Sequence, residues 1–262
     1  MKKGPIIIAL TCLFAIACKD KKDKPADQSS PYIQHLKEQA NSNPDSLGLR
    51  LTLIDALDSM GLYKEALPEI DQLITKDSLN HGLWITKGKV QQNTGDTVGA
   101  ILSFHRAARI YPSPEPLLAL ANLYAETKDS RVFEVCAKVD ELKMGRELDS
   151  YTTFFTGVYY ARMGDKQKAI ALFDKSINYN YTLMDNYIEK GSLYYEDKKY
   201  DEAIKVFKVA AAINNTYADA YYWQGKCFEA MNDKPSAITN YNRALVLDKN
   251  LKEAEQALKR LK

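Results

Sequence analysis

The fold of this chain is decided by one stretch, residues 191–210, which reads GSLYYEDKKYDEAIKVFKVA. Its spacing recurs 34 residues later, where Gly225 takes the place of Gly191 and Tyr241 takes the place of Phe207. A fixed period of this length marks an internal repeat in which each copy is one supersecondary unit. The chain is therefore expected to consist of stacked copies of a single helical motif.

Projected along the chain, this period predicts six units of two antiparallel helices: 47–80, 81–113, 114–149, 150–183, 184–217 and 218–251. The eighth position is Gly or Ala in five of the six units, and the twentieth is Ala in five of the six, which allows the paired helices to approach closely. Gly95-Asp96 and Gly164-Asp165 lie between the helices, because a left-handed glycine ends one helix and an aspartate caps the next.

These features resemble the tetratricopeptide repeat (TPR) family. The resemblance implies an all-α fold, a TPR solenoid of about six repeats whose helix pairs stack into a right-handed superhelix. Residues 31–46 and 252–262 are predicted to be capping helices, since the end units of a solenoid need a polar outer face.

The third unit departs from the pattern. Phe133 replaces the alanine of the twentieth position, and two extra residues precede Ser150. The second helix of this unit is therefore expected to sit further out or at a different angle. We consider two outcomes, a looser joint near residues 144–148 that separates two blocks, or harmless drift within one rigid superhelix.

The composition excludes several classes of function. Lys and Arg exceed Asp and Glu by only 36 − 34 = 2, which argues against a surface that binds nucleic acid by neutralising phosphates. The three histidines form no pair at the i, i+4 spacing of a zinc helix, and Cys-x-x-Cys, phosphate-loop and Gly-x-Ser-x-Gly motifs are missing. We predict no enzyme activity, no cofactor and no metal.

Two cysteines, Cys136 and Cys227, lie in the third and sixth units. Units that far apart in a stack hold their Cα atoms well beyond the roughly 7 Å limit for a disulfide. Both residues are predicted to be buried small hydrophobes.

The N-terminus is interpreted as a targeting sequence. Residues 1–17 combine a basic start with a short apolar run, as in a signal peptide, and the sequence before Cys18 resembles the lipobox of bacterial lipoproteins. The resemblance implies lipidation of Cys18, with residues 18–30 as a disordered tether; the alternative is cleavage nearby with Cys18 as a bystander. We expect attachment to the envelope of a Gram-negative bacterium, at the outer membrane facing the periplasm, with surface display as an alternative.

The resemblance to TPR proteins also implies a groove, lined by the first helix of each unit, that receives a protein or peptide partner. Carried over by register, the predicted groove residues are Lys89, Asn122, Tyr151, Phe154, Arg162, Ile188, Ser192, Tyr195, Tyr222 and Lys226. The half of the groove that the fourth to sixth units supply is rich in aromatic residues, which is typical of interface anchors. Replacing Phe154 and Tyr222 by Ala is expected to weaken binding without unfolding the chain.

Two functions are consistent with such a surface. The preferred one is a lipid-anchored TPR scaffold that helps to assemble or organise an envelope complex. Chaperone-tail binding is not implied, because the Lys and Asn pattern of that TPR subgroup is missing: Asn122 stands alone, with Leu118 at the lysine position. The alternative is a glycan-binding surface lipoprotein that uses the aromatic half of the groove.

Overall fold

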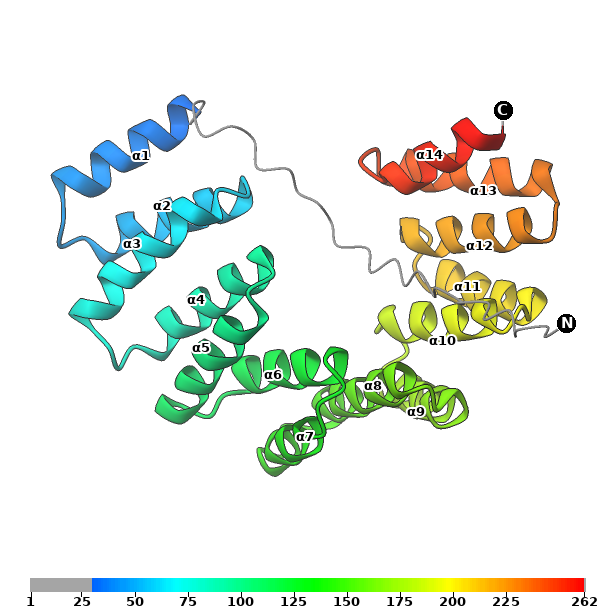
Figure 1. Cartoon of the computed structure of the whole chain (residues 1–262), viewed down its shortest axis with the longest axis horizontal. Helices are drawn as coiled ribbons and strands as arrows, with labels where there is room; N and C mark the ends of the chain where they lie inside the picture. Colours follow the sequence, from blue (N-terminus) through cyan, green and yellow to red (C-terminus); the bar gives the residue numbers. More distant parts are fainter. Residues whose placement is uncertain (1–29, 262) are drawn as a thin grey trace, which may run out of the picture. The chain divides into compact units, whose positions relative to one another are not determined.

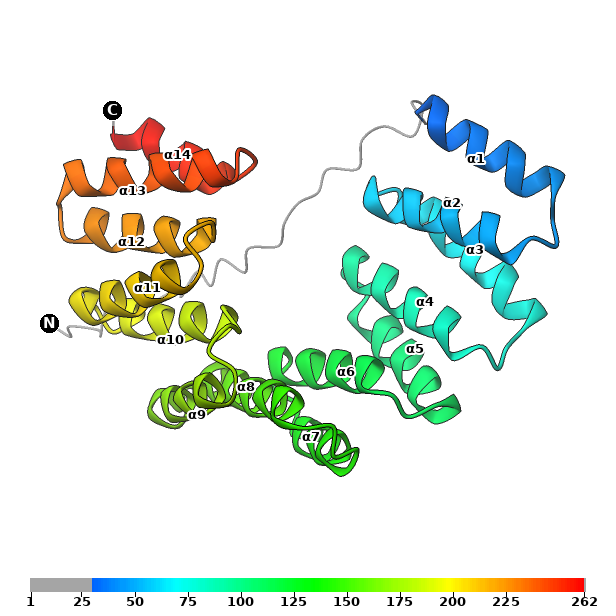
Figure 2. The same cartoon turned by 180° about the vertical axis from the view of Figure 1, so that it is seen from behind.

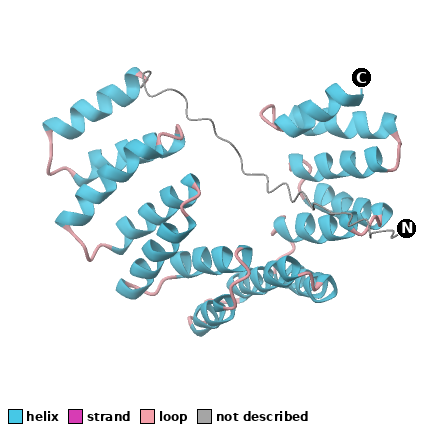
Figure 3. Ribbon diagram, viewed as in Figure 1, coloured by secondary structure: helices cyan, strands magenta, loops and turns pink. Residues whose placement is uncertain are grey.

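The computed structural model describes residues 30–261, and within that range the chain forms fourteen α-helices and no β-strand. Figures 1 and 2 show the helices from two sides, and Figure 3 shows that short loops connect them. The all-α prediction is confirmed. The predicted signal peptide, Cys18 and almost all of the predicted tether lie outside the described residues.

The described part of the chain divides into two compact units, one that ends at Ala66 and one that begins at Leu67. The division falls within helix α3, Tyr63–Lys76. The joint considered near residues 144–148 does not coincide with it, because α6 and α7 both pack against α8 across that stretch.

The first unit contains α1, Pro31–Ser42, and α2, Leu47–Ser59, followed by the start of α3. The side chains of Ser30 and Ser46 cap α1 and α2 by accepting hydrogen bonds from backbone amides of the first turn. Such caps satisfy donors that a helix leaves free at its start. The buried hydrophobic residues of this unit are Ile33, Leu36, Ala40, Leu53, Ile54, Leu57, Tyr63 and Ala66.

The second unit continues with eleven helices after α3: α4 His81–Thr94, α5 Thr97–Ile110, α6 Pro114–Glu126, α7 Arg131–Glu141, α8 Arg146–Met163, α9 Lys166–Tyr179, α10 Asp185–Glu196, α11 Tyr200–Ile213, α12 Ala218–Ala230, α13 Lys234–Leu247 and α14 Lys252–Leu261. They pack as successive pairs, α4 with α5 through α12 with α13, and α14 covers α13. Gly95 and Gly164 adopt the left-handed conformation between helices, and Asp96 and Asp165 cap the helices that follow, as predicted.

Four of these pairs share one packing device, an aromatic ring of the second helix that lies directly over a glycine of the first. The partners are Gly88 with Phe104, Gly157 with Phe173, Gly191 with Phe207 and Gly225 with Tyr241. A Cβ atom at any of these glycines would overlap the ring. The conspicuous residues of the repeat therefore build the frame of the molecule.

The remaining pair, α6 with α7, packs closely through a different set of residues. In α5 the buried stripe is Ala100, Ser103, Phe104 and Ala107, which are the fourth, seventh, eighth and eleventh residues of that helix. In α7 the stripe begins two residues earlier and consists of Val132, Val135, Cys136 and Val139. Phe133 therefore lies outside the core. The centroid of its ring is 5.0 Å from that of Tyr159 and 5.9 Å from that of Tyr160, both on α8.

Within the second unit, first helices of neighbouring pairs also contact one another: α6 with α8, α8 with α10, and α10 with α12. Residues on these helices can therefore form one continuous surface. Among the described helices, none is both long and apolar enough to cross a membrane.

Candidate partner-binding site

A pocket of about 380 Å³ lies between α10, α12, α13 and α14. Three predicted groove residues, Tyr195, Tyr222 and Lys226, line it together. Register placed these residues on two different helices, and the packing of α10 against α12 brings them to one spot. The remaining lining residues are Glu229, Ala230, Tyr241, Glu253, Gln256 and Arg260.

Lys226 sits among aromatic rings. Its Nζ atom lies 4.0 Å from the ring centroid of Trp223, 5.0 Å from that of Tyr195 and 5.8 Å from that of Tyr222. A cation at these distances is attracted to the ring faces. Burial lowers the pKa of Lys226, against the opposing effects of Cys227 and Glu229.

The C-terminal helix completes the pocket. Arg260 of α14 donates hydrogen bonds to the carboxylate of Glu229 on α12, at 3.1 and 3.3 Å. The hydroxyl of Tyr241 on α13 donates to the same carboxylate at 2.6 Å. Glu229 and Arg260 therefore neutralise each other, and they tie α12 to the last two helices.

Arg162, another predicted groove residue, is engaged by its neighbours. It forms ion pairs with Glu126 of α6 and Glu189 of α10, with the closest N–O distance 2.9 Å in each. Each pair uses two nitrogen atoms of the guanidinium group. Arg162 on α8 thus links the first helices of three neighbouring pairs, α6, α8 and α10.

The prediction that Phe154 offers its ring to a partner is wrong in this structure. Its side chain is only 7% exposed, and its ring packs 5.3 Å from Phe155 and 5.8 Å from Phe173. The position faces the groove by register, but the large ring turns into the core between α8 and α9. Tyr151, one turn earlier, is half-buried and stacks on Phe155.

The other predicted residues do not gather at the pocket. Lys89 is exposed and pairs with Glu115 of α6. The Ser192 hydroxyl donates to the backbone carbonyl of Glu189 in its own helix, and Ile188 packs on the core beside Phe207. Asn122 is half-buried on α6.

Sequence reasoning missed the contribution of α14 to this site. Its pattern predicted a capping helix, and Ala254, Ala257 and Leu258 do bury against α13. The exposed residues Glu253, Gln256 and Arg260 reach the pocket. The sequence feature that could have indicated this contribution is the excess of charged residues on the exposed side of α14. A helix face that only contacts solvent has the same feature.

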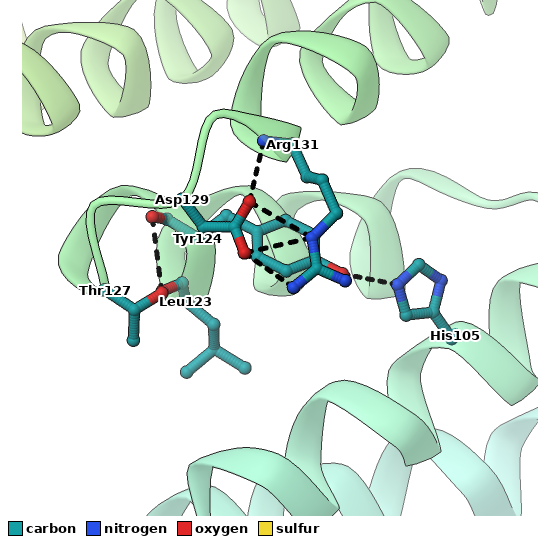
Figure 4. A network of polar contacts seen from close by, with 6 residues as sticks. All are labelled: His105, Leu123, Tyr124, Thr127, Asp129 and Arg131. Atoms are coloured by element: carbon teal, nitrogen blue, oxygen red, sulfur yellow. Dashed lines mark hydrogen bonds and ion pairs between the residues drawn. The ribbon is translucent and has the colours of Figure 1, made fainter.

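A second polar cluster joins α5, α6 and α7 (Figure 4). The hydroxyl of the buried Tyr124 lies 2.5 Å from Nε2 of His105, and the Arg131 guanidinium lies over the Tyr124 ring at 4.4 Å while pairing with Asp129. Burial and the charge of Arg131 lower the pKa of His105. His105 gives the buried hydroxyl of Tyr124 a hydrogen-bond partner, so the cluster is explained by its role in stabilising the fold.

The described residues hold no group of three or more His, Cys, Asp or Glu side chains arranged to bind a metal ion. Cys136 and Cys227 are both buried, free thiols, as predicted.

Two family models match the C-terminal part of the chain. One, described as TPR repeat, covers residues 191–232, and the other, described as tetratricopeptide repeat, covers residues 219–262. RNA polymerase II-associated protein 3 of Xenopus tropicalis is 31% identical over 108 residues. That match takes in 40% of this chain but only 16% of the length of the relative.

Solved structures share the fold over most of the chain. A tetratricopeptide repeat protein from Parabacteroides merdae has a TM-score of 0.71 at 16% identity, covering 87% of this chain and 90% of its own. Yeast Tom70 has a TM-score of 0.60 at 16% identity, covering 87% and 57%. PilW, described as a widely conserved type IV pilus biogenesis factor, has a TM-score of 0.58 at 17% identity, covering 80% and 97%.

The repeat models and the shared helical fold agree with the repeat spacing read from the sequence and with the helix pairs of the structure. Residues 191–262 therefore consist of tetratricopeptide repeats, and the chain shares the all-α fold of solved tetratricopeptide repeat proteins.

Proposed function

We propose that this chain is a scaffold protein that binds a protein or peptide partner along its first helices, with the pocket between α10, α12, α13 and α14 at the centre of the contact. The observation that carries the proposal is the convergence of Tyr195, Tyr222 and Lys226 on that pocket. Large amphipathic rings and a cation around a concave site are typical of residues that dominate binding energy. Tom70 and PilW add an architectural precedent only, since their identity to this chain is below 20%.

Photo-crosslinking in the native cell tests this function. A photoreactive amino acid at Tyr222 is expected to capture a partner protein. The control carries the same group at Val246, a residue of α13 that is 68% exposed and is not among the residues that line the pocket. Equal capture at both positions, or no capture at Tyr222, would contradict a partner site at this pocket.

The cellular setting is a further part of the proposal. Cys18 carries acyl chains that attach the chain to the cell envelope, because the preceding residues resemble a lipobox and several acyl chains give lasting attachment. Mass spectrometry of the N-terminal peptide from native protein is expected to show an acylated Cys18, and Cys18→Ser is expected to release the chain from membranes. An unmodified Cys18 in native protein would remove the anchor from the proposal.

Protein binding is preferred to glycan binding because of the ring geometry. A sugar platform needs free, accessible ring faces, whereas Tyr195 and Tyr222 meet Trp223 at interplanar angles of 75° and 70°. Lys226 lies over all three rings. A glycan array probed with the purified chain is expected to show no binding; micromolar binding that Tyr222→Ala abolishes would reverse this order.

A further inference from the structure

Lys226 differs from the other well-placed cations of the second unit. Arg162, Lys190 and Arg260 each pair with a carboxylate. Across the described residues, by contrast, no carboxylate lies within the 4.0 Å of an ion pair around Lys226, whose close neighbours are aromatic rings. The Lys226 ammonium is therefore half-buried beside a pocket without an anion to balance it.

The ring contacts leave part of this ammonium unsatisfied. A lysine ammonium has three N–H donors and no acceptor, and a ring face attracts the charge without offering a lone pair. Removing such a group from water costs free energy unless a partner compensates for it. An acceptor that enters the pocket would recover that cost, and a negatively charged acceptor would recover the most.

The two carboxylates of the pocket do not serve this purpose. Glu229 accepts hydrogen bonds from Arg260 and Tyr241, so its charge is already balanced. Glu253 lies on the exposed face of α14, where water solvates it. Of the described residues, Lys226 is thus the unpaired charge of the pocket that is partly shielded from water, whereas the unpaired Glu253 is exposed to it.

We propose that this pocket is a carboxylate-binding site, in which Lys226 forms an ion pair with an acidic group of the bound segment while Tyr195, Tyr222 and Trp223 surround the pair. The inference rests on the proposed function and specifies the chemistry of its partner as an acidic peptide segment. Arg260 has a positioning role: by holding Glu229, it keeps that carboxylate away from Lys226 and leaves the site open for a ligand.

Calorimetric titration of the full chain in mild detergent tests the site with three octapeptide probes. The first alternates Ser and Glu and is blocked at both ends. The second replaces each Glu by Gln and is also blocked, and the third is the Gln peptide with a free C-terminal carboxylate. Binding of the first probe alone identifies side-chain carboxylates as the ligand, and binding of the third as well extends the site to a chain terminus. Equal binding of the blocked Gln peptide would overturn the proposal.

Variants locate the binding at Lys226. Lys226→Gln is expected to weaken binding of the Glu peptide by about tenfold or more, since a charged partner is lost. Lys226→Arg is expected to retain most of it. The matched control is Lys208→Gln, an exposed lysine of α11, which is expected to leave affinity unchanged. An equal loss in both Gln variants would indicate nonspecific charge attraction and would overturn the site.

Glu253→Gln is expected to change the affinity for the Glu peptide in the direction opposite to that of Lys226→Gln. Removing a negative charge from the rim is expected to strengthen binding of the Glu peptide. A basic octapeptide of Ser and Lys that binds more tightly than the Glu peptide, and loses affinity in Glu253→Gln, would show that the pocket selects cations instead. Thermal unfolding of every variant checks that the fold is intact.

The two proposals fail in distinguishable ways. If crosslinking at Tyr222 captures a protein and Lys226→Gln does not reduce its yield, the carboxylate site is wrong and the scaffold function remains. If the Glu peptide binds through Lys226 but no protein is captured in cells, the carboxylate site remains and the scaffold function is wrong.

Discussion

Arg162 on α8 and Glu189 on α10 form a two-point ion pair, in which each terminal guanidinium nitrogen lies 2.9 Å from a carboxylate oxygen. The same guanidinium also holds Glu126 of α6 at 2.9 Å. Three first helices of the second unit are therefore linked through one side chain. The planar fork of arginine matches two carboxylates in a way that a lysine ammonium cannot.

Arg162→Lys is accordingly expected to lower the free energy of unfolding by about 1–2 kcal/mol, because the lysine keeps the charge but loses the paired hydrogen bonds. Chemical denaturation measures the change. Arg109→Lys is the control, since Arg109 is exposed on α5 and the same exchange there is expected to cost about 0.5 kcal/mol or less. Similar losses in both variants would mean that the link adds nothing to stability.

Gly225→Ala tests the packing of rings over glycines. Its Cβ atom would lie 2.7 Å from Cδ1 of Tyr241, a fully buried ring, so the helices must separate or the ring must move. Overpacking of this kind is expected to cost about 1–3 kcal/mol of stability. In the control, Gly48→Ala in α2, the new methyl group meets open space, and the change is expected to stabilise the helix by about 0.5–1 kcal/mol. Denaturation midpoints that move together would contradict the packing argument.

Phe154→Ala separates core packing from partner binding. Because the ring is buried, its loss is expected to destabilise the chain by about 3–5 kcal/mol. Phe133→Ala removes a ring that is 39% exposed and is expected to cost clearly less. Tyr222→Ala is expected to reduce partner capture while the fold is kept. A Phe154→Ala chain with unchanged stability and lost binding would restore this residue to the groove.

The two buried thiols provide a test that depends on pH. Burial raises the pKa of both Cys136 and Cys227 to about 12, so neither forms the reactive thiolate at pH 8 in the folded chain. Mass mapping after iodoacetamide treatment is expected to find both unmodified until denaturant is added. Rapid modification of either thiol in native buffer would show local opening around that helix.

The same thiols contribute to stability with a defined sign. An unfolded thiol ionises near pH 9.0, whereas the folded thiols ionise near pH 12. Between these values the unfolded chain binds fewer protons, so stability falls as the pH rises. The contribution is complete below pH 9 and declines as the pH approaches 12. A double Cys136→Ser, Cys227→Ala chain is expected to show a shallower decline in this range.

Much of the architecture could be predicted from the sequence because repeat packing is a local property. The period of 34 residues places a glycine opposite a ring within four of the helix pairs, and the turns Gly95-Asp96 and Gly164-Asp165 mark where one helix ends and the next begins. The irregularity of the third unit could also be predicted, from Phe133 at the position of an alanine. Its structural result could not, because the shift of the buried stripe to Val132 depends on how α7 rotates against its neighbours.

The candidate site divides in the same way. Register alone placed Tyr195, Tyr222 and Lys226 on first helices, where residues of one period share a face. Only the tertiary structure shows that these three residues meet at a pocket, that Arg162 forms ion pairs with two carboxylates, and that the Phe154 side chain is buried in the core. The reason is physical: position along a helix determines the face of a residue, but its neighbours on other helices depend on the crossing of helix pairs and on side-chain rotamers.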